Sequence, residues 1–352
     1  MHLLTETRAR IVPIDRAIED ATQHLLDAKT KPRRSLGRLE DVACQIAAIR
    51  GTMSPTASDK AIVVMGADHG VVEAGVSAYP QEVTAQMMHN FANGGAAINV
   101  LARHAGARVI VVDMGVKEPL APDLGIRTER IAAGTRNFAG GPAMTREQAV
   151  RAIEVGIRIA AELAAGGVTL LGIGEMGIGN TTASSAIVAA LTGISPDEVT
   201  GRGTGIDDAT LRRKIDVIKQ ALAANRPDPT DALDTLAKLG GFEIAGLCGV
   251  VLGAAAARIP VVMDGFIAST AALCATRLAA HATSYLLASH RSVEAGHRIV
   301  LGELGAKPLL DLELRLGEGT GAALAMSLVD ASLRILAEMA TFTSAGVSDS
   351  GS

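Results

Sequence analysis

Carboxylates, histidines and glycine-rich turns follow several short apolar runs of the chain, and these residue types carry acid–base and anion-binding chemistry. The polar side chains placed in this way are Asp68, His69, Asp113, Glu175, Asp264 and His290. Because the carboxyl ends of parallel strands meet at one edge of a sheet, we expect these side chains to lie around a cleft there.

The stretch Leu171–Ser185 contains Gly172, Gly174 and Gly177 in the GxGxxG spacing of dinucleotide-binding folds. The spacing alone is a weak signal in a chain with 38 glycines among 352 residues. Glu175 falls inside the predicted turn, where it would repel a pyrophosphate. A turn that only packs a helix against a strand remains the alternative to a phosphate site.

An anion site is predicted after a strand over residues 168–173. Residues 172–179 supply open glycine-rich backbone, and residues 180–182 (Asn-Thr-Thr) can cap a helix over residues 183–191. Free amides and the positive end of a helix suit a phosphate group.

A second glycine-rich loop precedes a helix within residues 201–214. Asp207 and Asp208 are interpreted as residues that favour the start of this helix. Lys214, about two turns further on, is either an exposed side chain or a phosphate ligand, and the spacing leaves both open.

Glu318 stands between two glycines directly before the last long helix. A carboxylate on such a loop is either a solvated cap residue or an acid/base held in a cleft. Tyr79, one of two tyrosines, is predicted to lie in a loop, where its ring could stack on a flat substrate. Gln86 could donate a hydrogen bond to the same substrate.

Metal and hydrolase sites are not predicted. Asp68 and His69 have only Glu73 as a further acid close by, and no second histidine stands at ligand spacing. No GxSxG turn is present, and Ser289–His290 is interpreted as the approach to a helix that begins near Ser292.

Composition excludes other classes. The 33 basic and 37 acidic residues give a net charge of -4, aromatic residues make up 2%, and Trp is absent, so no nucleic-acid partner is expected. Cys44, Cys248 and Cys274 are predicted to be buried thiols of a reducing compartment. No export signal is seen, and the apolar run over residues 244–257 is too short for a bilayer, so a cytoplasmic protein without a membrane partner is expected.

Short apolar runs alternate with Ala-rich helical patterns, which predicts an α/β fold with a parallel sheet. The predicted strands lie within residues 61–70, 107–116, 168–177, 259–265 and 284–290. Residues 14–50, interrupted at Lys31–Pro32, and the amphipathic run after Gly319 are predicted to be helical. The predicted organisation is a small helical lobe (1–55 and 320–343), a large α/β catalytic domain (56–319) and a disordered tail (344–352).

Several blocks in order resemble the nicotinate-nucleotide:dimethylbenzimidazole phosphoribosyltransferase family of cobalamin assembly, over nearly the whole chain. These blocks are KPRRSLGRLE from Lys31, GADHGVVEAGVSAYPQEVT from Gly66, NFANGGAAINVLA from Asn90, GIGEMGIGNTTASSAI from Gly172, TGRGTGID from Thr200, PVVMDGFI from Pro260, SHRSVEAGH from Ser289 and RLGEGTGAALA from Arg315. The family pattern has a glycine within KPxGSLG where this chain has Arg34, which concerns only a local turn of the N-terminal lobe.

The resemblance implies an enzyme that joins dimethylbenzimidazole to the ribose of nicotinate mononucleotide and releases nicotinate. Glu318 is then expected to be the general base that removes the benzimidazole N–H proton. Glu175 is expected to stabilise positive charge on the ribose or to hold its hydroxyls. A Rossmann-like three-layer fold with a smaller helical lobe, a homodimer and no cofactor or metal are implied in the same way.

The resemblance also assigns binding residues. The nucleotide and phosphate side is expected at Gly177, Gly179, Asn180, Thr181, Thr182, Gly203, Lys214, Asp264, Ser292, Arg315 and Gly317, with Asp264 at a strand end facing the cleft. The base is expected between Tyr79, Gln86, Met176 and Leu316. Two alternatives stay open: an NAD(P)-dependent oxidoreductase that uses the GxGxxG turn, and a non-catalytic nucleotide or benzimidazole sensor.

Overall fold

The structure, a computed structural model, describes residues 2–203 and 205–348. Its centre is one sheet of six parallel strands in the order β3-β2-β1-β4-β5-β6. The strands are β1 (Lys60–Ala67), β2 (Ala107–Gly115), β3 (Arg127–Thr128), β4 (Leu170–Met176), β5 (Val261–Met263) and β6 (Leu286–Ala288). The predicted parallel α/β fold is confirmed, and the two-residue strand β3 is one that the sequence patterns did not predict.

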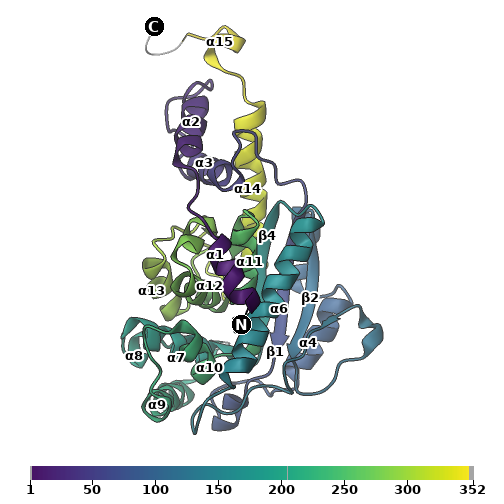
Figure 1. The fold of residues 1–352 in the computed structure, drawn as a ribbon, viewed down its shortest axis with the longest axis vertical. Coiled ribbons are helices and arrows are strands. Elements are labelled where there is room, and N and C mark those ends of the chain that lie inside the picture. The colour runs from purple at the N-terminus through teal and green to yellow at the C-terminus, as the bar shows by residue number, and fades with distance from the viewer. Residues whose placement is uncertain (1, 204, 349–352) are drawn as a thin grey trace.

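Helices connect the strands and cover both faces of the sheet (Figure 1). They are α1 (His2–Arg10), α2 (Arg16–Asp27), α3 (Arg38–Arg50), α4 (Val83–Ala92), α5 (Ala97–Ala105), α6 (Arg146–Ala165), α7 (Asn180–Thr192), α8 (Pro196–Val199), α9 (Asp208–Asn225), α10 (Ala232–Leu239), α11 (Phe242–Ala256), α12 (Phe266–Leu278), α13 (Ala295–Glu303), α14 (Thr320–Glu338) and α15 (Phe342–Ala345). Short 3-10 turns lie at Gly70–Ala74, Pro122–Leu124 and Ala280–Tyr285.

Two hydrophobic cores follow from the alternation of side chains along each strand. In β1, Val63 and Met65 point into the core that contains α6, α11 and α12, whereas Ile62 and Val64 point into the core with α5 and α14. Both faces are covered, so the central strands are apolar throughout, as parallel strands of a three-layer fold must be.

The strand order reverses between β1 and β4. From β1 the chain adds β2 and β3 on one side, and then β4, β5 and β6 on the other. In open parallel sheets this reversal leaves a crevice outside the carboxyl ends of the strands, and ligands bind there. The fold therefore directs attention to the residues that follow β1 and β4.

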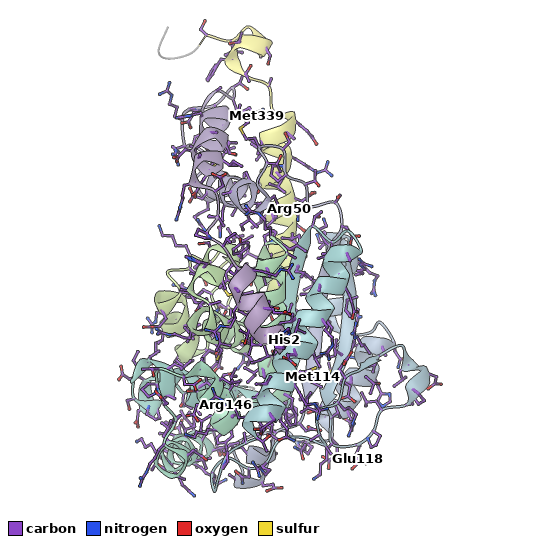
Figure 2. The ribbon with its side chains drawn as sticks, viewed as in Figure 1. His2, Arg50, Met114, Glu118, Arg146 and Met339 are labelled. Atoms are coloured by element: carbon purple, nitrogen blue, oxygen red, sulfur yellow. The ribbon has the colours of Figure 1, made fainter. Side chains whose placement is uncertain are left out.

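Of the helices predicted to form the small lobe, α2, α3 and α14 pack in series and α1 packs elsewhere. α2 packs against α3, and α3 packs against α14, at the end of the molecule that also carries Met339 (Figures 1 and 2). α1 packs instead against α6 and α11, two helices of the large domain. By its contacts α1 therefore groups with the large domain, and the division at residue 55 stays a prediction.

The cysteines, the apolar helix α14 and the C-terminal tail can also be compared with the predictions. All three cysteines are free and buried, as predicted. Within the described part of the chain, α14 is long and apolar enough to span a bilayer by length and composition, and 56% of its apolar stretch is buried inside the protein. The predicted disordered tail begins inside α15, and residues 349–352 lie outside the described residues.

Candidate active site

A cavity of about 90 Å³ opens at the carboxyl edge of the sheet, beside β4 and β5. Ten of the predicted site residues line it: Glu175, Met176, Gly177, Asn180, Thr181, Gly203, Ser292, Arg315, Leu316 and Gly317. Ile178, Gly265, Phe266, Ile267, His290 and Glu294 complete the lining. Segments more than 100 residues apart in the sequence therefore meet at one place.

A larger groove of about 430 Å³ lies elsewhere, along α2 and α3. Its charged side chains pair with each other, as Arg16 does with Glu19 at 2.6 Å and Arg38 with Asp41 at 3.0 Å. Glycine-rich backbone and buried carboxylates converge in the smaller cavity, so we take that cavity as the candidate active site.

The predicted turn at the GxGxxG glycines is wrong in part. The strand β4 continues to Met176, so Gly172 and Gly174 lie inside the strand. A Cβ atom on Gly174 would lie 2.3 Å from the Gly319 nitrogen and 2.5 Å from Glu318 backbone atoms. Gly174 therefore allows the loop before α14 to lie directly on β4. The first two glycines serve packing, and they bring Glu318 to the sheet.

The turn after β4 consists of residues 177–179 and also differs from the prediction. Gly179 is the N-cap of α7 with φ 94°, and its neighbour Asn180 caps nothing with its side chain. The Asn180 amide instead donates a hydrogen bond to Glu175 Oε2. Asn180 thus orients a carboxylate at the cavity wall. The backbone amides of Asn180 and Thr182 donate to the carbonyls of Gly177 and Gly179, both at 3.0 Å, so the anion site expected at the start of α7 stays a prediction.

Glu318 is held by two separate parts of the fold. Its backbone is left-handed, with φ 64°, and its Oε2 accepts a hydrogen bond from the Ile98 amide at 3.3 Å, at the start of α5. The side chain is 5% exposed, and burial together with the charge of Asp264 raises the pKa of Glu318. A raised pKa makes the ionised carboxylate a stronger base.

Asp264, expected to face the cavity, is not among the residues that line the cavity. Its Oδ1 accepts hydrogen bonds from the amides of Gly321 (2.7 Å) and Ala322 (3.3 Å), and its Oδ2 accepts one from Gly319 (3.0 Å). These amides belong to the first turn of α14 and its N-cap, which lack a cap of their own. Asp264 at the end of β5 is therefore a positioning residue for the Glu318 loop.

Glu175 lines the cavity beside Gly317 of the loop before α14, whereas Glu318 itself is not among the residues that line the cavity. A Cβ atom on Gly317 would lie 2.3 Å from Glu175 Oε1, so the glycine leaves room for the carboxylate. Burial, and after it the charges of Asp264 and Glu243, raise the pKa of Glu175 from 4.5 to about 8. The side chain is 6% exposed and holds its proton at neutral pH in the free protein.

Lys214 lies behind the cavity wall at its α7 end. Its Nζ donates hydrogen bonds to Thr181 Oγ1 at 2.9 Å and to the Gly201 carbonyl at 3.3 Å, and burial lowers its pKa to about 8. The exposed-side-chain alternative for Lys214 is therefore excluded. Asp207 is the N-cap of α9, bonded to the Thr210 amide at 2.8 Å, which confirms its structural interpretation.

The remaining predicted residues differ in their placement. Thr182 is buried in α7. Tyr79 is 49% exposed and Leu316 is 58% exposed, while Gln86 is exposed on α4. The base-binding assignments to these exposed residues stay predictions.

The other polar residues at strand ends support the backbone. Asp113 accepts hydrogen bonds from the amides of Gly115 and Val116, and Asp68 accepts one from Lys117. His69 pairs with Glu243 at 2.6 Å. No group of three or more His, Cys, Asp or Glu among the described residues could hold a metal ion.

His290, expected at the cleft as a polar residue after a strand, is buried and lines the cavity, and Glu294 is a further buried lining residue that the sequence patterns did not name. The predicted helix near Ser292 begins at Ala295, so the segment from His290 to Glu294 is an extended wall rather than a helix start. The position of His290 directly after a strand was the available signal.

Comparison with known proteins places this site in a class. The profile of a family described as phosphoribosyltransferase matches residues 11–347. Its members are expected to bind a nucleotide phosphate, for which the start of α7 is the predicted site in this chain.

Relatives narrow the class further. The nicotinate-nucleotide–dimethylbenzimidazole phosphoribosyltransferases of Geobacter metallireducens and Roseiflexus sp. are 57% and 59% identical to this chain. The alignments cover 99% of this chain and 98% and 99% of those proteins. A crystal structure of the enzyme of that name from Thermus thermophilus has 46% identity and a TM-score of 0.90, covering 96% of this chain and 100% of that chain. The chain belongs to the nicotinate-nucleotide–dimethylbenzimidazole phosphoribosyltransferase family.

Proposed function

We propose that this enzyme transfers the phosphoribosyl group of nicotinate mononucleotide to 5,6-dimethylbenzimidazole, giving α-ribazole 5′-phosphate and nicotinate. The observation that carries the proposal is the convergence of Glu175 and the loop before Glu318 with the start of α7, in a chain of this family. The oxidoreductase alternative has no support, because the first two glycines of its motif are packed inside β4.

The reaction needs a base and no acid for the leaving group. A benzimidazole nitrogen forms a bond to C1′ while the bond from C1′ to the pyridinium nitrogen breaks. That electron pair neutralises the pyridinium, and nicotinate leaves. The proton lost from the benzimidazole N–H passes to a carboxylate. Attack on the face opposite the departing ring converts the β-nucleotide into an α-product.

Glu318 is the proposed base. The Ile98 amide holds its carboxylate in a buried position, where burial raises its pKa. A carboxylate that is poorly solvated takes a proton more readily than one in water.

Glu175 is the proposed stabiliser of positive charge. At neutral pH it holds a proton in the free enzyme, since its pKa is about 8. A cationic pyridinium nucleotide bound beside it favours the ionised form, because opposite charges at close range lower the pKa of a carboxyl group. The carboxylate then faces the positive charge that develops on the ribose as nicotinate leaves.

The phosphate is proposed to bind at the start of α7, near Thr181, Gly203 and the Lys214 ammonium. Lys214 reaches Thr181 at 2.9 Å, and a Cβ atom on Gly203 would lie 3.2 Å from Thr181 Oγ1, so these residues form one corner. Tyr79, Gln86, Met176 and Leu316 remain the proposed contacts of the apolar base. A cytoplasmic location is likewise a proposal.

The test uses purified enzyme with nicotinate mononucleotide and dimethylbenzimidazole, without added metal, and measures released nicotinate and product mass. Glu318→Gln should lower kcat by about 10²–10⁴-fold, the usual contribution of a general base, while the Kd of the nucleotide from calorimetry stays within a few-fold. Glu313→Gln, an exposed acid on the same loop with a similar left-handed backbone, is the matched control and should retain activity.

Absence of nicotinate release by the wild-type enzyme refutes the proposed function. If both substrates then bind without turnover, the chain is the non-catalytic sensor considered above.

A further inference from the structure

His290 is a buried imidazole in the cavity wall that the mechanism above does not use. It follows the edge strand β6, is 2% exposed and lines the cavity with Gly265 and Ser292. A buried histidine needs a hydrogen-bond partner for each ring nitrogen. The partner of one nitrogen determines whether the other can donate to a ligand or accept from it.

Neighbouring groups determine the position of its proton. Ser289 Oγ lies 2.9 Å from His290 Nδ1 and 3.4 Å from the Asp264 carbonyl. A carbonyl only accepts, so the single Ser289 proton goes to it, and Oγ must accept from Nδ1–H. Asp264 Oδ1, 3.8 Å from Nδ1, favours a proton on that nitrogen too. In the neutral imidazole Nε2 is then a bare acceptor.

Nε2 has no protein partner within the described residues, and the neighbouring histidine cannot supply one. His297 Nδ1 accepts a hydrogen bond from the Ser292 amide at 3.0 Å, so its Nε2–H donates to Ser269 Oγ, also at 3.0 Å. A Cβ atom on Gly265 would lie 3.6 Å from His290 Nε2, which means that the absent side chain leaves space in front of this acceptor.

The substrates of the proposed function offer few donors for such an acceptor. On nicotinate mononucleotide with an ionised phosphate, only the two ribose hydroxyls donate, and on dimethylbenzimidazole only the ring N–H donates. The Glu318 carboxylate is bonded to the Ile98 amide at the start of α5, whereas the His290 ring lies beside Gly321 in the first turn of α14 and beside Gly265. The N–H proton is taken on the Glu318 side, which leaves the ribose hydroxyls for His290.

We propose that His290 Nε2 accepts a hydrogen bond from the 2′- or 3′-hydroxyl of the nucleotide and so fixes the ribose for attack at C1′. This inference rests on the proposed function. Asp264 then has two tasks, because the same carboxylate holds the first turn of α14 and favours the proton on His290 Nδ1.

The experiment compares wild type and His290→Asn with nicotinate mononucleotide and with its 2′-deoxy and 3′-deoxy analogues. Asparagine keeps a donor near the position of Nδ1 and removes the Nε2 acceptor. The variant should lower kcat/KM for the normal nucleotide about 10–100-fold, as expected when a buried hydroxyl loses its partner. With one of the two deoxy analogues, variant and wild type should agree within about twofold, since the contact is already absent.

Two results would overturn the assignment. One is an unchanged kcat/KM of His290→Asn for the normal nucleotide. The other is an equal loss for all three nucleotides, which would mean a structural role or a contact with the benzimidazole N–H. His297→Asn is the matched control, because this imidazole does not line the cavity, and its effect should be the same factor for every nucleotide.

A second variant keeps the test decisive if His290→Asn does not fold. Gly265→Ala places a methyl group beside Nε2 and should discriminate against the same hydroxyl without changing the imidazole; equal losses for all three nucleotides would again contradict the assignment. The Kd of each nucleotide, measured by calorimetry, separates the two proposals. If wild type binds nucleotide but releases no nicotinate, the proposed function fails, and the Kd values still decide the contact to His290.

Discussion

Glu175 holds its proton at neutral pH because β4 ends inside the protein, beside other carboxylates. Its pKa of about 8 lies above the ordinary 4.5, so between these values the folded state retains a proton that the unfolded chain has lost. The unfolded state then binds fewer protons, and the free energy of unfolding falls as the pH rises from 4.5 to 8. In the folded free protein this carboxyl group therefore lowers stability as the pH rises through neutrality.

Glu175→Gln should remove this pH dependence. At pH 5 the group is protonated in the folded protein and mostly ionised in the unfolded chain, but pH 5 lies so close to 4.5 that the cost to stability is only about 1 kcal/mol, and the variant should gain little there. At both pH values the quantity compared is the free energy of unfolding of the variant minus that of wild type. This difference should be larger at pH 8.5 than at pH 5 by on the order of 2–4 kcal/mol. Urea denaturation at the two pH values measures the difference, and Glu313→Gln, on an exposed residue, should show none. A gain that is the same at both pH values would contradict the assigned pKa.

Arg34 is a second residue-scale feature that the structure explains. It stands where the family pattern has glycine, and its φ of 59° is the left-handed region that favours glycine. The turn is therefore kept, and the arginine adopts the backbone conformation that the family's glycine supplies without strain.

At the scale of elements, β4 and the start of α14 form one unit. Gly174 lets the Glu318 loop lie on the strand, Gly317 admits the Glu175 side chain, and Asp264 on β5 supplies the cap of α14. The placement of each proposed catalytic carboxylate therefore depends on a glycine of the other element.

Gly174→Ala should lower activity far more than Gly172→Ala, although both glycines lie on β4 and face α14. The methyl of Gly174→Ala meets the backbone of residues 318 and 319 at 2.3–2.5 Å and must displace the Glu318 loop. The methyl of Gly172→Ala meets first the end of the flexible Met326 side chain at 2.9 Å, which can move. We expect a loss in kcat of about 100-fold or more against a few-fold, since small displacements of catalytic groups have effects of this size. Steady-state assays of both variants check the order, and equal losses would contradict it.

At the scale of the whole molecule, α14 connects the site to the helical lobe. It has 19 residues, a length of about 28 Å, so its C-terminal end with α2 and α3 lies far from Glu318 (Figure 1). No described residue before β1 lines the cavity. The helical lobe of a chain therefore does not cover the cavity of the same chain. Leu316 is exposed at the edge of the cavity, and Val293 and Leu312 are exposed in an adjoining groove.

The protein is expected to form a homodimer, as the family resemblance implies. Exposed apolar side chains next to the cavity are typical of surfaces that bind another protein. Sedimentation velocity at micromolar concentration should give a particle of twice the 36.0 kDa chain mass. A single 36.0 kDa species across that range would contradict the prediction.

The sequence by itself determined the parallel sheet, the approximate place of five of its strands and the family. These rest on local signals: apolar runs of strand length, helical periodicity between them and motif blocks read in order. It also placed Glu175 and Glu318 as candidates, because carboxylates among glycines are recognisable without a fold.

Only the tertiary structure decided which polar groups face the cavity. Asp264 and His290 both follow strands and look equivalent in the sequence, yet one is bonded to the start of α14 and the other lines the cavity, with no partner for its Nε2 among the described residues. In the same way Gly172 and Gly174 have the spacing of a phosphate loop but lie inside β4. The physical reason is that the direction of a side chain depends on contacts with segments distant in sequence, such as the first turn of α14, whereas secondary structure depends mainly on near neighbours.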